Sequence, residues 1–185
     1  MIHPDTELRF VSPAVGYGVF ATRRIPRGTL TWVLDPLDQL LPPGRARELE
    51  PGYGDLLLRY AYLDRAGNTV LSWDHGRFVN HSCDSSVASG GNDEFEIALR
   101  DIEAGEEITD DYAELETDEV FSCACGAASC RGQVGPAGRE VTRVGLSARV
   151  REVLRFAASV PQPLLRFARN PHQVEAALRG GLAAT

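Results

Sequence analysis

The chain has 185 residues, of which 43% are hydrophobic and 24% are charged. This composition is typical of one globular domain with a short extension. No apolar run approaches the roughly 18 residues that span a bilayer, and residues 1–5 lack the basic start of a signal peptide. We therefore expect a cytoplasmic protein that does not associate with membranes.

Charge is divided unevenly along the chain, whose net charge is −7. Residues 1–130 carry 10 Arg against 23 Asp and Glu, whereas residues 131–185 carry 9 Arg against 3 Glu. The first part should attract cations and the tail should attract anions. All 19 basic residues are Arg, so the chain has no lysine of its own.

The first part of the chain predicts short strands interrupted by loops. Residues 7–34 have the pattern of strands around glycine and proline turns. Residues 36–54 are rich in Pro and Gly, and we expect a loop there with one helical turn near residues 45–49. Residues 55–74 have the pattern of two strands joined at residues 65–68.

Later segments change from strands to helices. Residues 94–99 alternate as a half-buried strand does, and a turn follows at residues 104–106. Many short strands predict a mainly β (α+β) domain. Apolar residues at helical spacing then predict a helix in the tail: Leu146, Val150, Val153, Leu154 and Ala157. A second helix is predicted from Asn170 at its N-cap, Pro171 in its first turn and Gly180 at its end.

Three cysteines fall within eight residues, at Cys123, Cys125 and Cys130. Thiolates at this spacing can converge on one metal ion, and Gly126 can adopt the positive φ that lets the chain wrap around it. Tetrahedral zinc needs a fourth ligand, and Cys83 is the one cysteine left. Four thiolates leave no open position, so we expect a structural zinc ion rather than a catalytic one. Two disulfides are the alternative, which strained C-x-C bridges and the absence of an export signal disfavour.

Cys83 ends the segment Asn80-His81-Ser82-Cys83. Taken alone, these residues are a polar turn, and His81 is a histidine satisfied by its neighbours. Three further motifs in a fixed order point to function instead. A Gly-x-Gly turn at residues 16–18 precedes the segment, a Gly-Glu-Glu-Ile-Thr-Asp-Asp-Tyr run at residues 105–112 follows it, and then comes the cysteine cluster.

In this order, the motifs resemble those of SET-domain lysine methyltransferases with a post-SET zinc motif. The resemblance covers about two thirds of the chain, from Leu8 to Gly132. It implies a SET-domain β-clip of short strands with a knotted active-site loop, plus C-terminal helices. We expect a SET domain over residues 1–118, a post-SET zinc-binding segment over 119–134 and a helical extension over 135–185.

The resemblance also implies S-adenosylmethionine as cofactor and assigns residues to it. Gly16, Tyr17 and Gly18 would approach its methionine end with their backbone, because glycine permits close approach. Arg77 and Asn80 would contact its carboxylate and amino group. The cofactor's adenine would be held by the backbone of His81 and covered by the ring of Phe121.

Two tyrosines are implied for catalysis by the same resemblance. Tyr112 corresponds to the tyrosine beside the transferred methyl group, and Tyr60 to the tyrosine that lines the channel of the target lysine. For Tyr60 and Tyr62 the alternative is a core position, which strand aromatics usually occupy. Methyl transfer needs a neutral amine aligned with the methyl group and sheltered from water.

Two positions depart from the family pattern. Ser86 stands where the Asn-His-Ser-Cys motif usually continues with Asn, and Asp110 replaces an apolar residue two positions before Tyr112. A carboxylate at Asp110 could hydrogen-bond the substrate ammonium and oppose its deprotonation, or it could point away from the site.

We therefore expect transfer of a methyl group to the ε-amine of a lysine in a protein substrate. Residues 103–119 contain nine Asp or Glu and no base, which is either a solvated acidic face or a surface that attracts a basic substrate segment. The alternatives are an inactive SET-fold binding module stabilised by zinc, and a nucleic-acid contact through the Arg-rich tail. Packing of the tail helices on the domain is favoured over nucleic acid, and a dimer through them stays open.

Overall fold

The computed structural model describes residues 1–90, 93–115 and 120–180. Its strands form four small sheets. The largest has the order β1–β2–β10–β7, with bounds β1 Thr6–Ser12, β2 Gly16–Ala21, β7 Asn80–His81 and β10 Glu107–Asp110. The β7–β10 pair is parallel, whereas β2 pairs with both β1 and β10 in antiparallel fashion.

Three smaller antiparallel sheets surround this one. The sheet β3–β9–β8 comprises β3 Leu30–Val33, β8 Val87–Ser89 and β9 Phe95–Ala98. The sheet β4–β6–β5 comprises β4 Gln39–Leu41, β5 Ala61–Leu63 and β6 Thr69–Leu71. The pair β11–β12 comprises β11 Phe121–Ser122 and β12 Gln133–Val134. These short strands confirm the predicted mainly β domain.

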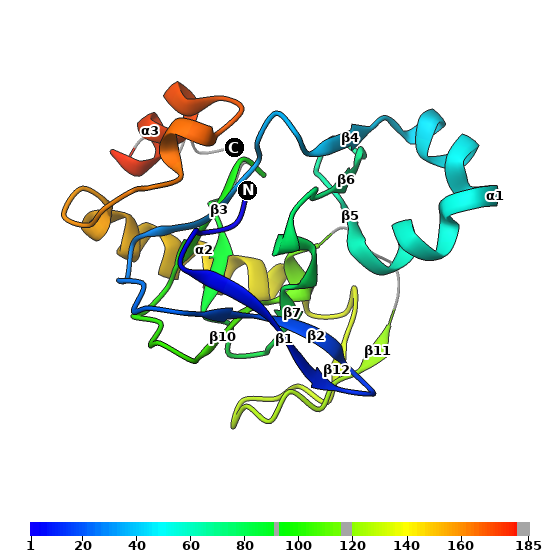
Figure 1. Cartoon of the computed structure of the whole chain (residues 1–185). Helices are drawn as coiled ribbons and strands as arrows, with labels where there is room; N and C mark the ends of the chain where they lie inside the picture. Colours follow the sequence, from blue (N-terminus) through cyan, green and yellow to red (C-terminus); the bar gives the residue numbers. More distant parts are fainter. Residues whose placement is uncertain (91–92, 116–119, 181–185) are drawn as a thin grey trace.

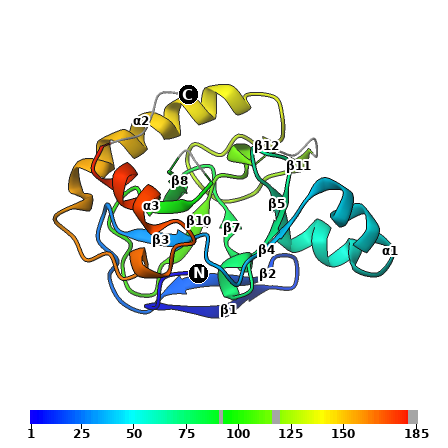
Figure 2. The same ribbon diagram turned by 90° about the horizontal axis from the view of Figure 1, so that it is seen from above.

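The helices flank the strands on different sides. In both ribbon views α1 projects from one end, α3 lies toward the other end, and α2 runs along a side of the domain (Figures 1 and 2). Their bounds, with those of the single-turn helices, are α1 Pro43–Tyr60, α2 Arg139–Ala157, α3 Pro171–Leu178, η1 His75–Phe78, η2 Tyr112–Glu114 and η3 Leu165–Phe167. In these described ranges, none combines the length and the apolar character needed to cross a membrane.

The prediction for residues 36–60 was wrong. We expected one helical turn followed by a strand from residue 55, but α1 runs to Tyr60 and the strands are confined to 61–63 and 69–71. Pro43 at the first turn suits a helix start, and a run of three leucines near the end favours helix. The sequence did not indicate this helix because Pro51, Gly52 and Gly54 are residue types that are common in loops and unfavourable inside helices.

The tail helix α2 packs on the domain as predicted. Its buried residues are the five that the apolar spacing indicated: Leu146, Val150, Val153, Leu154 and Ala157. They share one core with residues of β3 and β9 and with α3. Helix α3 begins after Asn170, and Gly180 has a positive φ of 90°. The Asn170 side chain makes no cap bond, however, and its Nδ2 donates to Glu94 Oε1.

We expect the tail to contribute directly to the stability of the whole domain. Val150→Ala should lower the free energy of unfolding by roughly 2–3 kcal/mol, since it removes two buried methyl groups and leaves a cavity. Val141→Ala on the same helix should change it little, because Val141 is 78% exposed and Val150 only 2%. Urea unfolding of both variants measures the difference, and equal stabilities would mean that α2 is not part of the cooperative core.

Candidate active site

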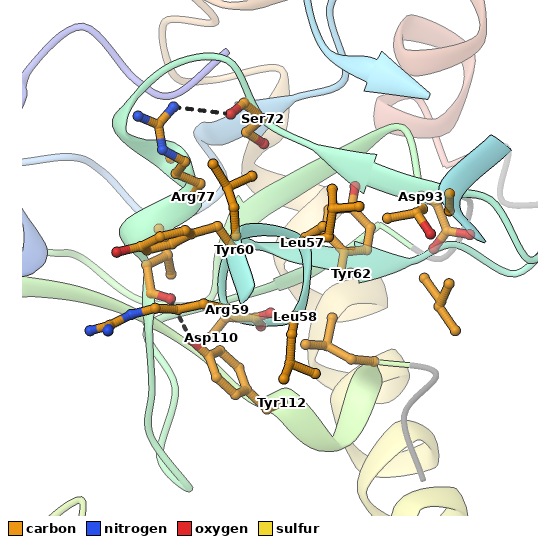
Figure 3. Close-up of a pocket in the computed structure, with 18 of the residues that line it drawn as sticks. Leu57, Leu58, Arg59, Tyr60, Tyr62, Ser72, Arg77, Asp93, Asp110 and Tyr112 are labelled. Atoms are coloured by element: carbon orange, nitrogen blue, oxygen red, sulfur yellow. Dashed lines mark hydrogen bonds between the residues drawn. The ribbon is translucent and has the colours of Figure 1, made fainter. Parts of the chain in front are cut away.

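A cleft of about 1400 Å³ opens between the end of α1 and the strands of the domain. The residues predicted for chemistry and for the target lysine, Tyr112 and Tyr60, line it. Tyr62 lines it as well, and it also packs against the core. Figure 3 shows Tyr60 and Tyr112 near the end of α1, with Tyr62 farther along the cleft. Tyr60 lies in the last turn of a helix rather than in a strand, and its ring meets that of Phe78 at 5.0 Å.

The two motifs predicted to hold the cofactor's methionine end are brought together. Asn80 Nδ2 donates to the Tyr17 carbonyl at 3.0 Å and to Glu107 Oε1 at 2.7 Å. Gly18 sits against this pair, because a Cβ there would lie 2.2 Å from Glu107 Oε1. Gly16 has a φ of 87°, a conformation that glycine adopts without strain. The glycines are therefore required by the close approach of β2 to Asn80.

Arg77 reaches the same cleft but is bound to its own chain. Its Nη1 donates to the Trp73 carbonyl at 2.9 Å, with longer bonds to the Ser72 and Asp74 carbonyls. Its guanidinium also lies 5.0 Å from the centre of the Phe78 ring. Contact of Arg77 with a cofactor carboxylate stays a prediction. These three bonds use Nη1, so Nη2 or Nε would make that contact.

The three residues predicted around the adenine and the methyl group form one aromatic cluster. The ring of His81 lies 5.4 Å from that of Tyr112 and 5.8 Å from that of Phe121, and the last two rings are 6.1 Å apart. His81 Nδ1 accepts from the Tyr112 backbone N–H at 3.1 Å. The start of η2 is thereby tied to β7.

The Tyr112 hydroxyl donates to the Val79 carbonyl at 2.7 Å. Burial raises the pKa of Tyr112, and the carboxylates of Asp110, Glu96 and Glu107 raise it further. The hydroxyl therefore keeps its proton at neutral pH. Tyr112 can position a reactant but is a poor base.

All four cysteines converge beside this cluster. Cys123 Sγ lies 3.8 Å from Cys83 Sγ and 3.7 Å from Cys130 Sγ, and Cys125 Sγ accepts from the Cys83 N–H at 3.4 Å. Gly126 has the predicted positive φ, at 77°. Although burial opposes it, hydrogen bonds from the backbones of Cys83 and Ala127 lower the pKa of Cys125 to about 6. This favours the thiolate that metal binding requires.

The sequence did not predict that His81 would join this group. The donor atoms of His81, Cys83, Cys123 and Cys125 all lie within 4.8 Å of one another. The His81 Nε2 is 3.3 Å from Cys83 Sγ, a distance that suits a hydrogen bond to sulfur. This group does not include Cys130, whose Sγ lies 3.7 Å from Cys123 Sγ, so both His81 and Cys130 are candidates for the fourth ligand beside Cys83, Cys123 and Cys125.

One ion pair joins the cysteine segment to the strand before Tyr112. Arg131 Nη1 and Nη2 donate to the two carboxylate oxygens of Asp111 at 2.7 and 2.6 Å. The Asp111 side chain is only 3% exposed, whereas that of Arg131 is 32% exposed. Such a fork geometry fixes orientation as well as charge.

Loss of this pair should loosen the cysteine segment. Arg131→Gln should lower the free energy of unfolding by about 1–3 kcal/mol, because the buried Asp111 carboxylate loses its guanidinium partner and, among the described residues, keeps only the Ala113 N–H as donor. Arg24→Gln, which breaks the exposed pair with Asp101, should have a much smaller effect. Thermal unfolding of the two variants compares them, and equal shifts would show that Arg131 acts only as a surface charge.

The chain matches the family model described as "SET domain" over residues 16–113. It is 33% identical over 141 residues to "Histone-lysine N-methyltransferase, H3 lysine-4 specific" of Cryptococcus neoformans, covering 68% of this chain and 10% of that protein. To "Histone-lysine N-methyltransferase ATX2" of Arabidopsis thaliana it is 30% identical over 145 residues, covering 72% and 13%. The chain thus spans about a tenth of the length of these curated relatives.

A solved structure supports the same fold. The methyltransferase domain of human "Histone-lysine N-methyltransferase SETMAR" matches with a TM-score of 0.51 and 20% sequence identity, over 71% of this chain and 57% of that one. The likeness at this identity concerns the fold alone. The matched residues 16–113 include the glycine turn, the Asn-His-Ser-Cys segment and Tyr112. This chain belongs to the SET domain family.

Proposed function

We propose that the chain transfers a methyl group from S-adenosylmethionine to the ε-amine of a lysine in another protein. One observation carries this proposal: Asn80 is bonded to the Gly16–Gly18 turn, and the next residue, His81, is bonded to Tyr112, which lines the cleft. Membership of the SET domain family supports it. The relatives' names, which specify histone-lysine methyltransferases, support it as well.

The residues of the cleft suit a displacement reaction that needs alignment rather than covalent catalysis. S-adenosylmethionine, when bound, supplies an electrophilic methyl group. The Gly16–Gly18 backbone and Asn80 would hold it, with His81 and Phe121 at its adenine. The Tyr112 oxygen and the Val79 carbonyl would orient the methyl group through weak C–H···O contacts. Tyr60 and Tyr62 would enclose the lysine side chain and exclude water.

The substrate we propose is a lysine within a basic segment. Six acidic residues line the cleft beside five arginines, and the acids, among them Asp55 and Asp110, would attract such a segment. Two of the relatives are named as specific for lysine 4 of histone H3. An H3 peptide that contains this lysine is therefore the first probe to test.

We further propose that the four cysteines bind one structural zinc ion. With Zn–S bonds of about 2.3 Å, two sulfurs on a tetrahedral zinc lie about 3.8 Å apart. The Cys123 distances to Cys83 and Cys130, 3.8 and 3.7 Å, fit this value. His81 would then donate to the Cys83 thiolate as a supporting hydrogen bond. Such a site supplies no catalytic water but ties Phe121 and the cysteine segment to His81.

Cofactor binding and methyl transfer test the proposed activity separately. Isothermal titration should show S-adenosylmethionine binding to the wild type and at least about tenfold weaker binding to Gly18→Ala, whose Cβ would displace Glu107 and Asn80. Gly44→Ala is the matched control, since nothing lies within 4 Å of a Cβ there. Unchanged affinity in Gly18→Ala would place the cofactor elsewhere.

Transfer of a labelled methyl group to the H3 peptide, and to a mixture of core histones, tests the second step. Tyr112→Phe should reduce the rate at least about tenfold while retaining cofactor binding, because only its hydroxyl is lost. Any methylated lysine must come from the substrate, since the chain has none. Cofactor binding without transfer to any lysine-bearing protein would favour the inactive binding module.

Metal removal tests the zinc proposal. Elemental analysis should find one zinc per chain, and chelation or Cys130→Ser should weaken S-adenosylmethionine binding before the domain unfolds. The reason is that Phe121 and the Arg131–Asp111 pair would lose their anchor. Zinc-free protein with unchanged cofactor affinity would contradict this role.

A further inference from the structure

Three carboxyl groups from three different elements meet on the wall of the cleft. They belong to Glu96 of β9, Asp110 of β10 and Glu114 of η2, and all three line the cleft. Ser89 stands directly opposite Glu96 in the β8–β9 pair, and its N–H donates to Glu114 Oε2 at 3.1 Å. The fold therefore places these groups together.

Asp110 is the most buried of the three, at 7% exposure. Its Oδ1 accepts from the N–H of the next residue, Asp111, at 2.7 Å. Within residues 1–90, 93–115 and 120–180, no other hydrogen bond or ion pair involves this carboxylate. Figure 3 shows Asp110 with Tyr112 at the cleft, and Oδ2 is available to a ligand there. An ionised carboxylate can accept further hydrogen bonds, so a donor on a ligand in the cleft could bind Asp110.

The groups that face this carboxylate are mostly acidic. They are Asp111 and Tyr112 beside it in the chain, and Glu96 and Glu114 on the same wall of the cleft. Arg59 of α1 and Arg139 of α2 also line the cleft. The cations nearby have other partners: Arg131 binds Asp111, Arg77 binds main-chain carbonyls, and Arg65 lies 3.9 Å from Asp93. From β7, His81 faces Asp111, with Nδ1 3.7 Å from its carboxylate. No cation therefore neutralises Asp110 within the part of the chain that the structure describes.

This environment makes a carboxylate more basic than usual. Burial raises the pKa of Asp110 to about 7, and the charge of Asp111 contributes. Burial and the charge of Asp110 raise the pKa of Glu114 to about 8. Burial, with Asp110 and Glu114, also raises the pKa of Glu96. Asp110 and Glu114 therefore exchange protons near neutral pH instead of staying ionised.

We propose that Asp110 accepts the proton that the substrate ammonium must lose before methyl transfer, with Glu96 and Glu114 sharing that proton. This inference rests on the proposed function. In the first step an Nε–H bond of the ammonium breaks and an O–H bond forms on Asp110. The freed lone pair then forms the N–C bond, and the electrons of the broken C–S bond stay on sulfur. Glu114, which is partly exposed and carries a proton near pH 7, releases that proton to water and then accepts the one on Asp110.

A titration of the free protein tests the proton acceptor without any substrate. Carbon-13 NMR of the side-chain carboxyls should show a group that titrates near pH 7 and is absent from Asp110→Asn. Glu140→Gln, which removes an exposed carboxylate on α2, is the matched control and should leave that signal unchanged. Asp110→Asn should also lower the pH at which Glu114 titrates, because it removes a neighbouring negative charge. Titration of Asp110 near pH 4 would overturn the proposal.

The pH dependence of transfer to the H3 peptide tests the role in turnover. Near pH 7, Asp110→Asn should lower kcat about 100-fold, within the usual range for a lost general base. The deficit should shrink toward pH 10, where free lysine is already substantially neutral. It should also be smaller for a peptide with S-aminoethylcysteine in place of lysine, whose amine is less basic. Glu140→Gln should match the wild type throughout.

If Asp110→Asn lowers kcat by the same factor at every pH, and equally for the lysine and the S-aminoethylcysteine peptides, Asp110 only shapes the cleft. That result would overturn the proposal. These outcomes differ from failure of the proposed function. If the wild type binds no S-adenosylmethionine, both the function and the inference fall. If it binds the cofactor but leaves the peptide unmethylated, the NMR titration still decides whether Asp110 is a base of the required strength.

Discussion

A parallel ladder of only two residue pairs sets the geometry of the whole site. It joins Asn80 to Thr109 and His81 to Asp110. A parallel pair requires a long connection between its strands, and here that connection contains β8, β9 and the turn at residues 104–106. On one side of the ladder Asn80 reaches the glycine turn of β2. On the other, His81 accepts from Tyr112 and Cys83 enters the cysteine cluster.

The helical tail packs against the elements that carry this site, although the family match ends at residue 113. Helix α2 packs against the β3–β9–β8 sheet that carries Glu96. Arg143 of α2 also donates to the Glu114 carbonyl at 2.7 Å, at the end of the turn that begins with Tyr112. The wall of the cleft therefore depends on a segment outside the matched region. This burial also explains the apolar face of α2 without a partner chain.

The sequence predicted the parts of the site that lie in short motifs, since close packing or the chemistry of the side chain restricts the residue type at those positions. Gly18, Asn80 and the four cysteines are such cases. It did not predict Glu96 or Glu114, because an acidic residue in a strand or turn usually faces water. The sequence also did not predict helix α1, because Pro51 within it is typical of a loop. The domain boundary at residues 118–119 lies outside the described residues, and the dimer and the cytoplasmic location stay predictions.

Asp110 had two interpretations in the sequence, and the structure favours the one that faces the site. A carboxylate beside an ammonium normally stabilises the charged amine and opposes reaction. Between an ordinary Asp and a free lysine, proton transfer is uphill by about 9 kcal/mol, at about 1.4 kcal/mol for each unit of pKa difference. With the pKa of Asp110 at about 7, that difference falls to about 5 kcal/mol. Transfer of the ammonium from water into the cleft lowers the free energy of proton transfer further, because a neutral amine and carboxylic acid are buried more easily than an ion pair. Asp110 replaces an apolar residue of the family pattern. Its burial and its acidic neighbour Asp111 raise its pKa and therefore make it a more effective base.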